Sequence, residues 1–154
     1  MVTQDVFLTE DGRQHAISQL EFLRTVKRAE VAQYLHEAKE SGDVIDNAAY
    51  EDAKDAQARL EGRILELEQM LAAAQVISHV PTHEISLGSV VQLRTAENRE
   101  YQYTVVGAYE AKPAAGLISN ESPVGKALLG CKVGDEVTVS TPGGVKVYTI
   151  LRIE

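Results

Sequence analysis

Residues 53–74 read AKDAQARLEGRILELEQMLAAA, and this stretch decides the fold of the first half of the chain. Its apolar side chains recur in steps of three and four residues, at Ala53, Ala56, Leu60, Ile64, Leu67, Leu71 and Ala74. This heptad-like spacing predicts a long helix whose apolar seam packs along a second helix.

The second helix is predicted just upstream. Thr9 is the expected N-cap, and Glu10 and Asp11 place negative charge in the first turn, where it is favourable. Apolar residues then follow at helical spacing, at Ile17, Leu20, Leu23, Val26, Val31, Leu35 and Ala38. Ser41-Gly42-Asp43 interrupts this pattern, so the two helices should form an antiparallel hairpin within residues 1–77. A helix of ~30 residues spans ~45 Å, more than a domain of ~75 residues can cover, so the hairpin should project.

The composition changes near Ile77, after which all four Pro residues occur. Residues 78–84 are the expected linker, and residues 85–154 are expected to form a β domain. Alternating apolar and polar residues predict its strands, at residues 90–94, 101–106, 136–140 and 145–151. Ser122 as N-cap and Pro123 at the first helical position predict one short helix. The fold class is therefore α+β, an antiparallel two-helix coiled coil followed by a small antiparallel β domain with one short helix.

The chain has 154 residues and a net charge of −8. That acidity argues against tight independent binding to duplex DNA, which needs clustered Lys and Arg. The single cysteine, Cys131, excludes an internal disulfide and a multi-cysteine metal site. No basic N-terminal stretch leads into an apolar segment, and no apolar run approaches the ~18 residues of a membrane span. We therefore expect a cytoplasmic protein without membrane contact.

Two carboxylates lie between the predicted helices, in Gly42-Asp43-Val44-Ile45-Asp46. Asp43 and Asp46 are three residues apart, which places both on one side of a helical turn. Two adjacent carboxylates suit a hard cation such as Mg²⁺, but they are too few to hold it alone, so a partner would supply the other ligands. The same residue types also cap helices, and the spacing alone leaves both interpretations open.

The residues of this tip resemble a known family. The pattern Gly42-Asp43-x-x-Asp46-Asn47-Ala48-x-Tyr50 is similar to the tip motif of the bacterial Gre transcript-cleavage factors. The second half is similar to the C-terminal signature of that family, in the segments Leu117-Ile118-Ser119, Ser122-Pro123, Ala127-Leu128-Leu129-Gly130, Gly134-Asp135 and Thr141-Pro142-Gly143-Gly144. The resemblance covers essentially the whole chain, and the acidic total resembles the GreA-like subgroup more than the GreB-like one.

The resemblance implies a mechanism. The hairpin would enter the secondary channel of bacterial RNA polymerase, where Asp43 and Asp46 assist the polymerase-bound Mg²⁺. Asn47 and Tyr50 would shape the tip. The polymerase itself would cut the 3′ end of backtracked RNA. The chain is therefore expected not to be an enzyme, to have no cofactor of its own and to hold no metal stably when free.

The resemblance also implies an FKBP-like fold for the second domain, which would dock on the polymerase beside the channel. Its expected contact is the loop Glu121-Ser122-Pro123. A proline at that place is equally explained by helix initiation.

The chain departs from the family pattern at three tip positions. The family commonly has Glu where Asp46 stands, a basic residue where Ile45 stands and Glu where Ala49 stands. Some Gre-like paralogues with altered acidic tips inhibit the polymerase. An alternative function is therefore a paralogue that occupies the same channel without stimulating cleavage. A third is a coiled-coil scaffold whose β domain binds another protein.

Overall fold

The computed structural model of the protein describes residues 5–41 and 47–154. The chain divides into two compact units. One unit is Arg13–Ala73, and the other combines the N-terminal residues up to Gly12 with Ala74–Glu154. Among the described residues, no helix is long and apolar enough to cross a membrane.

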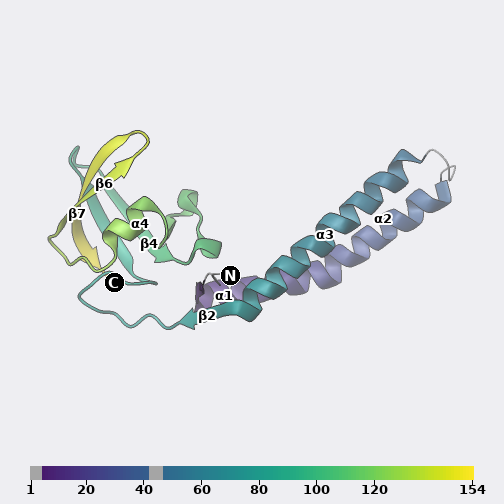
Figure 1. Cartoon of the computed structure of the whole chain (residues 1–154), viewed down its shortest axis with the longest axis horizontal. Coiled ribbons are helices and arrows are strands. Elements are labelled where there is room, and N and C mark those ends of the chain that lie inside the picture. Colours follow the sequence, from purple (N-terminus) through teal and green to yellow (C-terminus); the bar gives the residue numbers. More distant parts are fainter. Residues whose placement is uncertain (1–4, 42–46) are drawn as a thin grey trace. The chain divides into compact units, whose positions relative to one another are not determined.

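The helical unit is a two-armed hairpin, which confirms the prediction from the seam pattern (Figure 1). Its first arm consists of α1 (Glu10–Phe22), the π-helical segment η1 (Leu23–Lys27) and α2 (Arg28–Ser41). Its second arm is α3 (Ala48–Ala73).

Ion pairs between the two arms show how the arms run relative to each other. The guanidinium of Arg28 donates two hydrogen bonds of 2.9 Å to the carboxylate of Glu61, and Arg24 pairs with Glu68. The partner's number rises as the arginine's number falls, so the arms run antiparallel. The seam between them is closed by side chains that are each at most 7% exposed, namely Ala16, Leu20, Ala38, Ala53, Ile64, Leu67 and Met70.

The first arm contains one turn that is not α-helical, the segment η1. The N–H of Arg28 donates to the carbonyl of Leu23, five residues earlier, which is the π-helical bond. Such a turn holds more residues than an α-helical turn, so it shifts the positions around it away from the regular 3.6-residue period. Val26, one of the apolar residues at helical spacing in the first arm, lies within this segment and is 43% exposed.

The other unit contains a five-stranded sheet with the order β5-β4-β3-β7-β6. Its strands are β3 (Val90–Thr95), β4 (Glu100–Val106), β5 (Leu117–Ser119), β6 (Glu136–Thr141) and β7 (Gly144–Ile153). The four predicted strands correspond to β3, β4, β6 and β7, which pair antiparallel as expected.

The strand β5 was not predicted, and it pairs in parallel with β4, so the sheet is mixed rather than purely antiparallel. The chain between β4 and β5 passes through η2 (Ala108–Glu110) and η3 (Pro113–Ala115). This longer connection permits the parallel orientation, which a two-residue hairpin turn does not.

A second, two-stranded sheet joins residues from both ends of the hairpin sequence. β1 (Val6–Thr9) and β2 (Ala74–Ile77) pair in parallel, with Val6 opposite Ala74. Ala74, expected on the helical seam, begins β2 because α3 ends one residue earlier. The predicted N-cap is confirmed, because Oγ1 of Thr9 accepts a 3.1 Å hydrogen bond from the N–H of Gly12.

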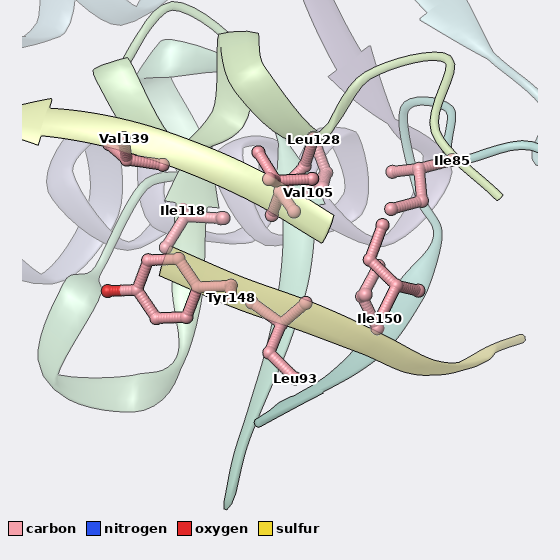
Figure 2. Packing of buried hydrophobic residues seen from close by; sticks show 10 residues of the cluster. Ile85, Leu93, Val105, Ile118, Leu128, Val139, Tyr148 and Ile150 are labelled. Carbon is pink, nitrogen blue, oxygen red and sulfur yellow. The ribbon is translucent and has the colours of Figure 1, made fainter. Parts of the chain in front are cut away.

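The short helix α4 (Pro123–Leu128) closes the core of the β domain (Figure 2). As predicted, Ser122 is its N-cap, with Oγ accepting a 3.1 Å hydrogen bond from the N–H of Gly125. A Cβ on Gly125 would lie 1.9 Å from the carbonyl oxygen of Ser119, so only glycine lets the helix approach β5 this closely. The buried core combines strand residues, one helical leucine and Ile85 from the segment before β3. Its members include Ile85, Leu93, Val105, Ile118, Leu128, Val139, Tyr148 and Ile150. The α+β class is confirmed.

Candidate functional site

The candidate site is the connection between α2 and α3. Asp43 and Asp46, the predicted metal-assisting carboxylates, belong to residues 42–46 and lie outside the described residues. Both flanks of this segment are described, since α2 ends at Ser41 and α3 begins at Ala48. The contacts described at this site are therefore those of the two flanks.

Asn47 ties the two flanks together through one side chain. Its Nδ2 donates a 2.6 Å hydrogen bond to the carbonyl oxygen of Ala38, in the last turns of α2. Its Oδ1 accepts a 3.1 Å hydrogen bond from the N–H of Tyr50, in the first turn of α3. Helix ends leave such carbonyl and N–H groups without intrahelical partners, and here one amide satisfies both ends. The residue that directly follows Asp46 is therefore anchored to both arms.

Small side chains bring the arms close beneath this clamp. Ala38 is 3% exposed and Ala53 is fully buried, so both fill the interface without bulk. Tyr50 is half-buried at the start of α3, and the ammonium of Lys54 lies 5.7 Å from the centre of its ring. A cation at this distance from an aromatic face is attracted to it. The structure thus brings Asn47 and Tyr50, the two predicted tip-supporting residues, into one turn.

The arms behind the tip are joined by the exposed pair of Arg28 and Glu61. The hydrogen bonds from Arg28 lower the pKa of the Glu61 carboxyl, and Glu61 in turn raises the pKa of Arg28. We did not predict this brace, because its partners are 33 residues apart. The only signal in the sequence was the opposite charge of two residues at positions that face each other across an antiparallel hairpin.

The predicted docking loop lies in the other unit, at the start of α4. The hydroxyl of Ser122 is used internally, since it accepts from Gly125 and donates a 2.7 Å hydrogen bond to the carbonyl of Ser119. Glu121 and Pro123 are exposed. The structure therefore leaves Glu121 and Pro123 free to contact a partner, while Ser122 shapes the turn that presents them.

The chain matches two family models that together cover most of its length. Residues 6–76 match the N-terminal domain of transcription elongation factors, and residues 80–154 match the C-terminal domain of the GreA/GreB transcription elongation factors.

Individual relatives agree. The chain is 46% identical to the transcription elongation factor GreA of Roseiflexus castenholzii, over 100% of both chains. It is also 46% identical to GreA of Acetivibrio thermocellus, over 97% of this chain and 96% of the relative. Among solved structures, GreA factor homolog 1 (Gfh1) of Thermus thermophilus is 36% identical, covers 98% of this chain and 99% of its own, and gives a TM-score of 0.45. The two family models and the GreA relatives show that the chain belongs to the GreA/GreB family of transcription elongation factors.

Proposed function

We propose that this elongation factor binds bacterial RNA polymerase through its secondary channel and stimulates the polymerase's own Mg²⁺-dependent cleavage of backtracked RNA. The observation that carries the proposal is the Asn47 clamp, which anchors the hairpin connection at the residue directly after Asp46. A helical cap alone would need only the bond to Tyr50. The second bond, to the carbonyl of Ala38, joins the ends of the two arms, as expected for a tip that acts at a partner's site.

The chemistry of the connection fits a shared magnesium ion. Asp43 and Asp46 offer hard oxygen ligands, which Mg²⁺ prefers, but an octahedral ion needs more ligands than two side chains supply. We infer that the polymerase supplies the others. When bound there, such an ion lowers the pKa of a coordinated water and so supplies the nucleophile for phosphodiester hydrolysis. In this arrangement the polymerase is the enzyme and the chain is its activator.

The role of each residue of this chain follows from its position. Asp43 and Asp46 place negative oxygens at the polymerase's metal and accept hydrogen bonds from water there. Asn47 joins the end of α2 to the start of α3, and Tyr50 lies in the first turn of α3. Because these ligands are weak and the arm is removable, the polymerase returns to its slower, unassisted cleavage when the factor departs.

The β domain would dock beside the channel through Glu121 and Pro123, which are exposed, on a turn shaped by Ser122. The large partner would bring both the nucleic acid and the positive charge that this acidic chain lacks. We place the protein in the cytoplasm, where such a partner acts, without a membrane partner. The inhibitory alternative is not favoured, because relatives at 44–46% identity over nearly the whole chain are GreA factors.

The experiment that tests this function uses a stalled, backtracked polymerase complex with radiolabelled RNA. The native protein should accelerate shortening of the RNA from its 3′ end. Asp43→Asn and Asp46→Asn should each remove the acceleration while binding to the polymerase is retained. Asp55→Asn is the matched control, since Asp55 is an exposed carboxylate of α3 away from the connection. A native protein that binds but slows both cleavage and synthesis would instead identify an inhibitor.

A further inference from the structure

A carboxylate of the β domain is bound to the start of the first helix. Glu110, in η2, is 101 residues from Thr9 in sequence. Its Oε2 accepts a 2.8 Å hydrogen bond from the N–H of Thr9, and its Oε1 accepts a 2.5 Å hydrogen bond from the hydroxyl of Thr9. Oε2 also lies 3.4 Å from the N–H of Gly107, which donates to it. One side chain thus gathers three donors, two of them from the junction of β1 and α1.

These bonds continue into the helix. Oγ1 of Thr9 accepts from the N–H of Gly12 while its own proton goes to Glu110. The hydroxyl of Thr9 therefore links the carboxylate of Glu110 to the N–H of Gly12, a group in the first helical turn that has no partner within the helix. Negative charge at a helix N-terminus is stabilising, because the helix dipole is positive there.

Two glycines make room for this arrangement. A Cβ on Gly12 would lie 1.9 Å from Oε1 of Glu110, and a Cβ on Gly107 would lie 1.9 Å from the carbonyl oxygen of Phe7. Glycine is otherwise unfavourable inside a helix. Its presence at position 12 is explained if the carboxylate must sit against the first turn.

We propose that Glu110 is a positioning residue that latches β1 and the first turn of α1 onto the β domain. Both partners belong to the same compact unit, so the latch acts within that unit, on the strand and the helical turn that lead into the first arm. An attached segment that is already ordered loses less conformational freedom when it binds. The consequence for cleavage rests on the function proposed above, whereas the latch itself does not.

The latch is tested first in the isolated protein, with Gly12→Ala in two backgrounds. Alanine normally strengthens a helix, so in a Glu110→Ala background Gly12→Ala should slow amide hydrogen exchange at residue 12 by about fivefold. In the native background the new methyl must displace the carboxylate, and exchange at Thr9 and residue 12 should instead become faster. Gly62→Ala is the matched control, since nothing lies within 4 Å of a Cβ there, and it should behave alike in both backgrounds. If Gly12→Ala changed the amide exchange rate in the same direction in both backgrounds, the proposed latch would be overturned.

The functional consequence is tested by titrating the factor in the cleavage assay. Thr9→Val, which removes the hydroxyl, and Glu110→Ala should raise the concentration for half-maximal cleavage about threefold or more, with the maximal rate unchanged. Thr9→Ser, which keeps the hydroxyl, should restore the native value. A loss of maximal rate alone would contradict a positioning role. If the native protein stimulates no cleavage, the proposed function fails. The directions of the hydrogen-exchange changes in the isolated protein still show whether the latch exists.

Discussion

Replacing Asn47 by alanine should destabilise the helical hairpin by about 2 kcal/mol. The change removes the cap on the Tyr50 N–H, for which losses of about 1 kcal/mol are typical. It also removes the 2.6 Å hydrogen bond to the carbonyl of Ala38, which contributes about 0.5–1.5 kcal/mol. One substitution removes both bonds, so the two losses together amount to about 2 kcal/mol.

Asn47→Asp separates the two contributions. Aspartate caps a helix as well as asparagine, so the bond to Tyr50 is kept. It has no N–H to donate, however, and it places a carboxylate oxygen against the carbonyl of Ala38. This variant should therefore lose at least the Ala38 contribution, about 1 kcal/mol, while amide exchange at Tyr50 stays slow.

Urea unfolding followed by far-ultraviolet circular dichroism measures the loss, since most of the helical signal comes from the hairpin. Amide hydrogen exchange at Tyr50 and Glu51 reports the cap locally. A loss below about 0.5 kcal/mol for Asn47→Ala would refute the reasoning that this side chain joins the arms. Amide exchange at Tyr50 that is as fast in the aspartate variant as in the alanine variant would show that the side chain at position 47 does not cap α3.

Four further outcomes are expected. Gly62→Ala should stabilise the hairpin by up to about 1 kcal/mol in urea unfolding, because a Cβ there meets nothing within 4 Å. Arg28 lowers the pKa of Glu61, so their pair stabilises the fold above the ordinary carboxyl pKa of 4.5, and this stabilisation is lost as the pH falls through the lowered pKa. Glu61→Gln should therefore reduce the dependence of the free energy of unfolding on pH in that acidic range. Burial raises the pKa of Cys131, so iodoacetamide at pH near 8 should alkylate the folded protein several-fold more slowly than the urea-unfolded protein. Leu128→Ala should destabilise the β domain by about 2–5 kcal/mol in thermal unfolding, because Leu128 is fully buried.

The parts of the fold that could be predicted from the sequence are those with a local signal. The seam residues of α3 repeat over many turns, and Thr9 and Ser122 stand directly before the helices they cap. The π-helical segment η1 was not predicted, because a π turn leaves no trace in a pattern of three- and four-residue steps. The strand β5 has only three residues, too few to display alternation.

Contacts between distant segments were beyond local pattern. The parallel pairing of β1 with β2 could not be predicted from a turn motif, because the whole helical hairpin lies between the two strands in sequence. Glu110 stood in the sequence as one acidic residue among many, and only the fold brings it to Thr9. The motif around Asn47 indicated a role at the tip, but its acceptor on Ala38 belongs to the other arm.

The most direct test of the account is the Mg²⁺ concentration that gives half-maximal cleavage of backtracked RNA, measured at saturating factor. If Asp43 and Asp46 lend ligands to the polymerase's metal, the native protein should lower this concentration relative to polymerase alone. The double variant Asp43→Asn, Asp46→Asn should bind and leave it at the value of polymerase alone. A double variant that lowers it as far as the native protein does would contradict the claim.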